Sequence, residues 1–549
     1  MNLSYFISKR ISLEQKQGFS SAIHKIAVIS IGVGLAAVLI SFLVMLGFQQ
    51  TVKDKVYSFS GHLVITKFTM NNSPEEQPMN YHIAVYDNEE QLLLQYINEK
   101  QYSLESQKDL IFEILSKDYL KKILNNAGEF RARVYSPLKV IHTGIGQALS
   151  SDKSSAYALS GINVGHLINE QPAVCSNTGC YTKAKERLIE DIPCALAKSL
   201  GRSTLEKAPL EWKVDGRDVK VFDGTTLNLK DTKANNAQYP KHSNQKRDVG
   251  YPQLRMLAVC SLSTGCVLDY ALEATKGKGT GEVTLLRSLL GCFNEHDIAL
   301  GDALFCNFFL VHDLMKKKVD VVIPGQVQRR YHFNEGTVLG PKDHSTQWSK
   351  PRRPKWMSKE EYDGYDKTID IREFEANGIV YMTTLKDASM YPKNIVHALY
   401  KRRWEVELHI RSIKTHMGMD RLSAQTPGMV RKEIAFHLLA YNIIRDIMVD
   451  GCIQEGALPT HISFKAALQL IGQLNPHFSS IPKNKKNKLY VQMLSIIVKN
   501  KVGKRPGRVE PRAIRKKTQR FPTLKADRKL LIDKLKRDRE QWLFNNDAA

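Results

Sequence analysis

Three acidic residues occupy positions from which a folded chain could use them in catalysis. Asp223 follows the apolar residues of VKVFDGTT and precedes a glycine, and Asp302 ends the short apolar stretch IALGD. Glu407 lies within a segment from Lys393 to about Met417 that is predicted to be one long helix. An acid at the end of a buried strand costs free energy unless it faces a cleft, is paired or binds a metal. Taken singly, each acid is better explained as a capping or turn residue.

The predicted helix around Glu407 collects several functional side-chain types on one face. At about 100° per residue, six side chains fall in or beside one narrow stripe: Tyr400, Arg403, Trp404, Glu407, Arg411 and Lys414. A stripe of one acid, three cations and two aromatic residues is not a core-facing surface. It could be a solvated face, or it could place a metal-binding acid beside groups that hold DNA phosphates and stack on a base.

The spacing of this stripe resembles the signature of insertion-sequence-4-type (IS4) transposases. The signature is Y-(2)-R-(3)-E-(6)-K, and four residues match it without a gap: Tyr400, Arg403, Glu407 and Lys414. VFDGTT around Asp223 and LGDALF around Asp302 look like the first and second acidic motifs of that family. The family often has Arg where Ala303 stands, which puts one accessory DNA contact in doubt but not the acid. The resemblance runs from about residue 100 to beyond residue 450.

The resemblance implies both a fold and a reaction. The fold is a ribonuclease-H-like α/β catalytic core, in which Asp223, Asp302 and Glu407 form a DDE triad and a β-rich insertion separates the second Asp from the Glu. The reaction is cut-and-paste DNA transposition, with metal-dependent strand cleavage and strand transfer at the ends of an insertion sequence. Two ions, Mg²⁺ or Mn²⁺, would be held about 3.5–4 Å apart by oxygen ligands. We therefore expect the three carboxylates to cluster within metal-bridging distance, even without metal.

Charge and resemblance together indicate DNA as the partner. The chain has 80 Lys and Arg against 56 Asp and Glu, a net charge of +24 that favours a polyanion, either nucleic acid or an anionic membrane surface. The side chains expected to contact transposon-end or target DNA are Tyr400, Arg403, Arg411, Lys414 and Trp356. Trp356 lies in WSKPRRPKWM and could stack on an unpaired base, or it could be a buried aromatic of the insertion. Joining two DNA ends implies at least a dimer in the DNA complex.

The patterns along the chain predict an α/β protein with several parts. Strand-like pieces such as IDIREFE and GIVYMTTL indicate the β-rich insertion independently of the resemblance. The predicted parts are a permease-like fragment at 1–90, a helical DNA-binding region at 100–210, the catalytic core at 211–325 and 386–450, the β-rich insertion at 326–385, and a helical basic C-terminal region at 451–549.

The first 90 residues differ in character from the rest. Ile26–Phe48 is a 23-residue run without a charge, which as a helix would be about 34 Å long and would cross a bilayer core. A buried helix of a soluble protein is the alternative interpretation. The region resembles the start of an FtsX/LolE-like ABC-transporter permease over about 80 residues. Our interpretation is a fusion near residues 80–100. A transposase would act in the cytoplasm at the nucleoid, whereas residues 26–48 could anchor the chain in the inner membrane.

Other segments of the chain carry weaker signals, and two other functions fit part of its pattern. The segment GKGTGE at 277–282 lacks the Walker spacing and is interpreted as a loop before a helix. His409 and His416 are interpreted as DNA-proximal or solvated rather than as ligands. A non-catalytic DNA-binding protein and a membrane-associated permease fragment are the alternatives to an enzyme. The three acids with the gapless signature argue against the first, and a single apolar span argues against the second, because an integral permease needs several.

Overall fold

The computed structural model divides the chain into two compact units, Met1–Glu99 and Lys100–Ala549. The structure describes residues 65–67, 81–83, 135–168, 173, 177–241, 250–420, 422–478, 481–503, 526 and 528–547. In the first unit, β1 (Ile65–Lys67) pairs antiparallel with β2 (Tyr81–Ile83). Within these described ranges, no helix is long and apolar enough to cross a membrane. The apolar segment Ile26–Phe48, predicted to be a transmembrane-type helix, lies outside them.

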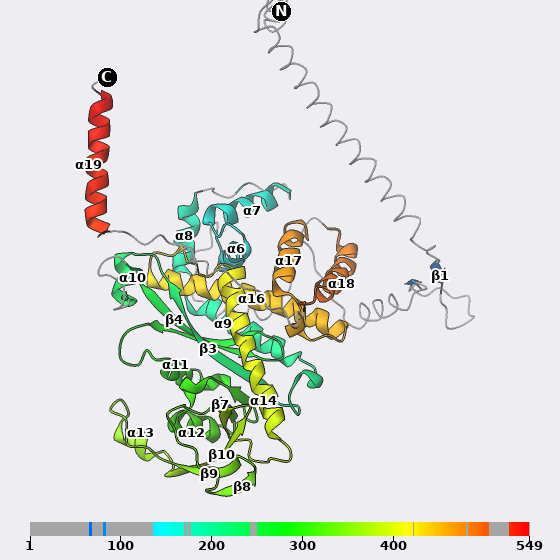
Figure 1. The fold of residues 1–549 in the computed structure, drawn as a ribbon. Coiled ribbons are helices and arrows are strands. Elements are labelled where there is room, and N and C mark those ends of the chain that lie inside the picture. The colour runs from blue at the N-terminus through cyan, green and yellow to red at the C-terminus, as the bar shows by residue number, and fades with distance from the viewer. Residues whose placement is uncertain are drawn as a thin grey trace, which may run out of the picture. The chain divides into compact units, whose positions relative to one another are not determined.

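In its described part, the second unit is built on one nine-stranded mixed sheet (Figure 1), in the order β5-β4-β3-β6-β7-β11-β10-β9-β8. β6 pairs parallel with β3 on one side and with β7 on the other, and the remaining neighbours are antiparallel. A mixed sheet covered by helices confirms the predicted α/β class. The strands are β3 (Val219–Asn228), β4 (Gln253–Ser261), β5 (Val267–Ala274), β6 (Ile298–Leu300), β7 (Asp320–Pro324), β8 (Thr337–Gly340), β9 (Asp343–Ser349), β10 (Thr368–Ala376) and β11 (Ile379–Thr383).

The strands of residues 326–385 continue this sheet. β11 pairs antiparallel with β7, with Thr383 opposite Val322, and β10, β9 and β8 follow outward. A short helix, α13 (Lys359–Asp363), lies between β9 and β10. The region therefore shares its backbone hydrogen bonding with the strands that carry the predicted acids. Its separation as a domain of its own stays a prediction.

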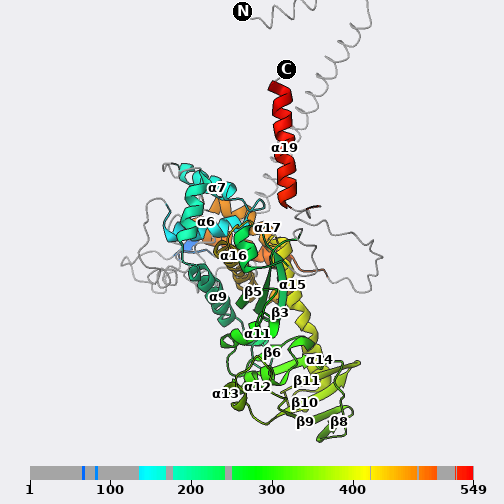
Figure 2. The same cartoon turned by 90° about the vertical axis from the view of Figure 1, so that its left-hand side faces the viewer.

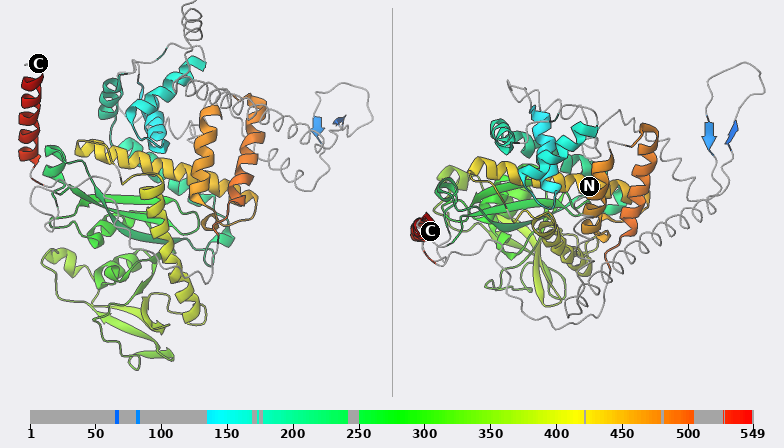
Figure 3. Two further views of the ribbon diagram at one scale, coloured as in Figure 1. Left: turned by 45° about the horizontal axis from the view of Figure 1, so that its top comes forward. Right: turned by 90° about the horizontal axis from the view of Figure 1, so that it is seen from above.

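Helices cover both faces of the sheet (Figures 2 and 3). α9 (Asp191–Glu206) and α16 (Pro427–Gln454) contact β5, and a helical segment with α14 (Lys393–Lys401) and α15 (Glu405–Arg411) crosses β10, β7 and β3. The other helices of the described residues are α6 (Pro137–Leu149), α7 (Ser155–Ile168), α8 (Thr178–Arg187), α10 (Lys233–Gln238), α11 (Glu282–Ser288), α12 (Phe308–Lys316), α17 (Phe464–Phe478), α18 (Lys483–Lys499) and α19 (Arg528–Asp547).

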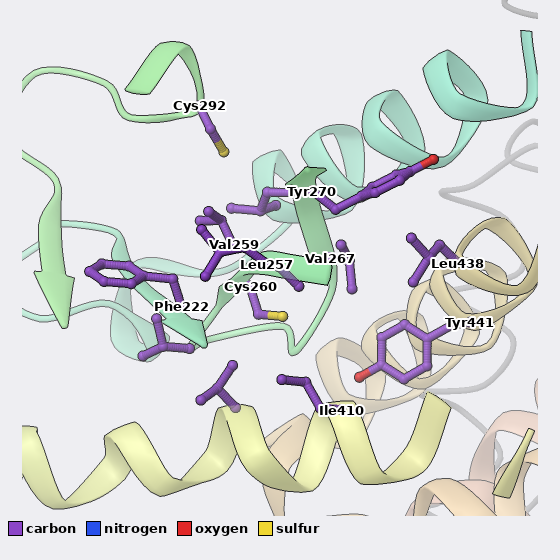
Figure 4. Close-up of a cluster of buried hydrophobic side chains, with 14 of the residues drawn as sticks. Phe222, Leu257, Val259, Cys260, Val267, Tyr270, Cys292, Ile410, Leu438 and Tyr441 are labelled. Carbon is purple, nitrogen blue, oxygen red and sulfur yellow. The ribbon is translucent and has the colours of Figure 1, made fainter. Parts of the chain in front are cut away.

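The core lies between the sheet and these helices. Figure 4 shows Tyr270 directed toward a helix on one side of the strands and Ile410 on a helix on the other. Val406, Ile410 and Ile413 are 0%, 7% and 0% exposed, and their i, i+4, i+7 spacing makes them one helix face. On the strand side, the ring of Phe222 meets that of Phe305 edge to face, 4.8 Å between centroids. Apolar burial therefore fixes the helix that carries Glu407 against the sheet.

The edge strand β5 is closed by a side chain of α16. Buried Asn442 accepts a hydrogen bond from Val267 N at 2.9 Å and donates to Val267 O at 2.8 Å, as a neighbouring strand would. The same amide donates to Ala197 O of α9 at 2.7 Å. Gly201 lets α9 approach, because a Cβ there would lie 2.2 Å from Val267 O. The edge groups of β5 at this point thus have partners within the chain.

Candidate active site

The parallel pairing of β3 with β6 brings the first two predicted acids together. Val221 lies opposite Leu300 in the register. Asp223 and Asp302 each come two residues after this pair, so both lie toward the same end of the two strands. Asp223 lies within β3, and Asp302 caps the short 3-10 helix η3 (Ala303–Phe305) that follows β6. Both side chains are half-buried.

The third acid lies on the helical segment that crosses this end of β3. The predicted single helix is continuous in chain but irregular: α14 runs into a 3-10 turn, η4 (Arg402–Trp404), then α15, then a π-helical turn, η5 (Ser412–His416). A 3-10 turn is tighter than an α-turn and a π-turn is wider. The angles expected for a regular helix therefore hold only approximately. Gly418, with φ +71°, follows the end of the segment.

Tyr400, Arg403 and Glu407 contact one another in sequence along this helix. Arg403 donates a hydrogen bond to Glu407 Oε1 at 2.8 Å, and its guanidinium lies 6.0 Å from the centre of the Tyr400 ring. Burial alone would lower the pKa of Arg403, but the bond to Glu407 and the charges around it raise that pKa. Burial also raises the pKa of Tyr400 to about 12, so its hydroxyl stays protonated. The structure thus places these three predicted residues on one face.

Lys414 ties the helix to the strand that carries Asp223. Its Nζ donates to Thr225 Oγ1 and to Thr226 O, both at 2.9 Å. These partners come two and three residues after Asp223 on β3. The fourth residue of the signature therefore lies at the same place as the acids.

The acids act on one another electrostatically. The pKa of Asp223 is raised to about 6. Burial is the main cause, the charges of Asp302 and Glu407 add to it, and the Gly224 N–H and the Arg403 guanidinium oppose it. Like charges that share a site disfavour each other's ionised form. Asp223 is thus the acid on which both other carboxylates act.

The expectation that the three carboxylates lie within metal-bridging distance is wrong for this structure. Among the described residues, no three His, Cys, Asp or Glu side chains are placed to hold one metal ion. Each acid instead accepts a hydrogen bond from its own surroundings: Asp223 from Gly224 N, Asp302 from Leu304 N, and Glu407 from Arg403.

The other two residues predicted to contact DNA have exposed side chains. Arg411 is exposed on α15. Trp356 is 62% exposed, so its interpretation as a buried aromatic is wrong. Its ring lies 5.0 Å from the Arg287 guanidinium and meets the Phe309 ring edge to face at 6.5 Å. His409 was interpreted as solvated or DNA-proximal, but it is buried and accepts from Arg445 at 2.9 Å.

Sequence reasoning missed one acid at this place, Glu282, the first residue of α11. The segment GKGTGE was interpreted as a loop before a helix, which the structure confirms, but its final residue received no role. Its carboxylate lies against Gly224, next to Asp223. The available signal was a glycine directly after a strand acid, because such a glycine marks a close approach by another group.

Comparisons with known proteins relate this chain to transposases. The family model described as the transposase DDE domain matches residues 215–443. Transposase InsG for insertion sequence element IS4 of Escherichia coli (strain K12) is 24% identical over 317 residues, which are 56% of this chain and 70% of that protein. A cryo-EM structure of piggyBac transposase in a synaptic complex with hairpin DNA aligns over 75% of this chain and 89% of its own, with 12% identity and a TM-score of 0.37.

The matched region contains Asp223, Asp302, Glu407 and the whole signature. This region is similar to the transposase DDE domain, which belongs to enzymes that cleave and transfer DNA strands with divalent metal ions. The chain is accordingly a DNA transposase, and DNA is its partner.

Replacing Asp223 by Asn should stabilise the metal-free protein near neutral pH. Because the folded-state pKa of about 6 lies above the ordinary 3.8, the cost of the charged carboxylate is absent below the lower value and fully present above the higher one. The shift would correspond to about 3 kcal/mol, which partial exposure reduces to roughly 1–2 kcal/mol. Urea unfolding of both proteins in chelator, below and above this pH window, measures it. A difference that does not grow with pH would contradict this account.

Proposed function

We propose that Asp223, Asp302 and Glu407 carry the strand cleavage and strand transfer of this transposase by holding divalent metal ions. The observation that supports this most is the effect of Asp302 and Glu407 on the pKa of Asp223, since it brings all three charges to one place. Three elements supply them: a strand, the loop after its parallel neighbour and a crossing helix. This arrangement fits a ribonuclease-H-like core.

The donor set fits Mg²⁺ or Mn²⁺. Carboxylate oxygens are the hard ligands that these ions prefer. The three acids are half-buried, and the guanidinium of Arg403 is hydrogen-bonded to Glu407. When bound, a pair of such ions activates the attacking oxygen and stabilises the leaving oxygen. The protein residues hold and orient; no side chain need form a covalent bond with DNA.

The cations and aromatic residues around the acids are proposed DNA contacts. Arg403 and Tyr400 lie beside Glu407, Lys414 beside Asp223, and exposed Arg411 on the same helix. They would hold the phosphates of the transposon end. Trp356 is exposed, and the guanidinium of Arg287 lies 5.0 Å from the centre of its ring. The ring would stack on an unpaired base. The substrates are then the ends of an insertion sequence and target DNA at the nucleoid, with at least a dimer joining two ends.

We further infer that the first 90 residues are not part of the transposase. The boundary between the two compact units at Glu99 and Lys100 supports a junction there, as does the matched domain, which begins well after it at residue 215. The permease-like origin of this piece and its anchoring in the inner membrane through residues 26–48 rest on the sequence resemblance.

Asp302→Asn and Glu407→Gln should each lower the rate of cleavage of end DNA at least about a thousandfold, equivalent to about 4 kcal/mol of barrier. End binding should persist, because neither change removes a cation. Glu405→Gln is the matched control: Glu405 lies on the same helix and accepts from Arg402 at 2.8 Å, but it is not among the three acids. The assay is Mg²⁺-dependent nicking of labelled end DNA, with binding by gel shift. Normal cleavage by Glu407→Gln would refute the triad.

Lys414→Ala should make DNA binding less dependent on salt. If Lys414 neutralises one phosphate, the slope of log affinity against log salt falls by about 0.9. Thr225→Val removes the same hydrogen bond to β3 without removing the charge, so its slope should equal that of the unaltered protein. Lys318→Ala is the second control. Lys318 is exposed, pairs with Glu295 and lies at the other end of the parallel strands. An unchanged slope in Lys414→Ala would remove it from the DNA contacts.

Deleting residues 1–90 should leave transposition equal or higher. The deletion removes the 23-residue apolar run and ends before the second compact unit begins. Excision of a marked element in cells, and the yield of soluble protein, compare the truncated and full chains. A truncated protein that is unfolded or inactive would show that these residues belong to the enzyme.

A further inference from the structure

The helices α17 and α18 belong to a strongly basic part of the chain. Residues 455–503 contain seven lysines and a single acid, Glu455. The two helices lie side by side (Figures 1 and 3). Ile462, before α17, pairs antiparallel with Lys501, after α18, so the start of α17 meets the end of α18. The lysines therefore fall into two groups, one at this end of the helix pair (Lys465, Lys499 and Lys501) and one around the start of α18 (Lys483, Lys485, Lys486 and Lys488).

The start of α17 is packed against the helical segment that carries Glu407. The ring of His416, in the π-turn η5, stacks on the ring of Phe464 with 6.5 Å between centroids and 17° between planes. Phe464 is 5% exposed. On α16, the ring of Tyr441 lies 5.0 Å from the Phe464 ring and the guanidinium of Arg445 lies 5.2 Å from it. Buried aromatic contacts thus fix the position of α17 relative to the proposed active site.

Three cationic side-chain types gather at this junction. Arg411 and Lys465 are exposed, and His416 is half-buried. In η5, Met417 N donates to Ser412 O, so residues five apart lie about one turn apart and His416 follows Arg411 on the same side. Burial lowers the pKa of His416, and the charges of Arg411 and Lys465 lower it further. The packing of α17 therefore extends the cations of α15 onto the C-terminal helices.

No acid balances these charges within the described part of the chain. No carboxylate there forms an ion pair with Arg411, Lys465 or Lys501. Glu455 lines a cleft with Lys499 and Lys501, and among the described residues no ion pair joins it to either lysine. The packing of α17 needs Phe464 but does not need cations beside it. Cations that gather without acids repel one another, and a bound polyanion would remove this repulsion.

We infer that Arg411, His416, Lys465, Lys499 and Lys501 form a second DNA-binding surface, on which the C-terminal helices hold the backbone of duplex DNA beside the active site. The partner fits because DNA is the polyanion on which a transposase acts. The surface extends the proposed DNA contacts of Arg411, and it does not depend on metal binding by the three acids.

The chemistry of this surface is suited to phosphates and not to bases. Lysine is a point charge that binds phosphate without reading sequence. Stacking on bases needs exposed aromatic rings, and the aromatic residues of α17 and α18 are buried: Phe464, Phe478 and Tyr490. Binding at this surface should therefore be independent of sequence. A duplex of unrelated sequence is then a sufficient probe.

The test is the salt dependence of binding of the full chain to such a duplex, measured in chelator by fluorescence anisotropy. Lys465→Gln should lower the slope of log affinity against log salt by about 0.9, and the triple variant with Lys499→Gln and Lys501→Gln should lower it by about 2.7. The substitutions leave Phe464 and its contacts in place, so the chain should fold. Urea unfolding of each variant checks this.

Lys485→Gln with Lys488→Gln is the matched control. Both lysines are exposed and lie on α18, near the start of the helix and away from Lys499. Their removal changes the net charge by two and should leave the slope equal to that of the unaltered protein. An equal fall in slope for this control would show that binding is spread over the whole basic region, which would overturn a surface at the start of α17.

The remaining outcomes separate this surface from other proposals. An unchanged slope in the triple variant would remove these lysines from the DNA contacts. Loss of binding to phosphatidylglycerol vesicles with an unchanged DNA slope would assign the surface to a membrane and overturn the inference. Normal cleavage by Asp302→Asn and Glu407→Gln would refute the metal-holding proposal, and the slopes measured in chelator would still decide the role of Lys465.

Discussion

Half-buried carboxylates repel one another, and the surrounding structure has to hold them in place against this repulsion. The charges of Asp302 and Glu407 add to the rise that burial causes in the pKa of Asp223, and like charges that are free to move would separate. Backbone hydrogen bonding between parallel strands prevents this for the first two, because the register cannot slip by one residue without turning every side chain to the other face. The burial of apolar side chains elsewhere in the chain offsets the free energy that the charged carboxylates cost.

Glu407 is held by different forces, since it lies on a helix that no backbone ladder fixes. Val406, Ile410 and Ile413 press one face of that helix into the core, and Lys414 bonds the far end to β3. Arg403 then supplies a positive charge among the acids. Glu407 is thus held by apolar packing, one lysine and one arginine, whereas the two strand acids are ordered by the hydrogen-bonded register of the sheet. These contacts hold Glu407 in place without any bound ion or DNA.

Much of this arrangement followed from local pattern. The strand-then-acid segments around Asp223 and Asp302, and the spacing around Glu407, are short-range signals that survive without knowledge of the fold. What escaped prediction depends on contacts between distant segments. Glu282 meets Gly224 only because α11 packs on the sheet, and burial of His409 depends on Arg445 of a later helix. The donor that each carboxylate finds also depends on the folded backbone, and periodicity carries no information about that.

The two edges of the sheet differ in what they allow. At one edge, the amide of Asn442 occupies the hydrogen-bonding groups of Val267 and α9 lies tight against them through Gly201. At the other, among the described strands, β8 pairs with β9 alone and exposes Val338 and Leu339. An open edge of this kind can accept a further strand. A strand gained beside β8 during evolution would lengthen the sheet at the end far from β3, while the acids stayed where they are.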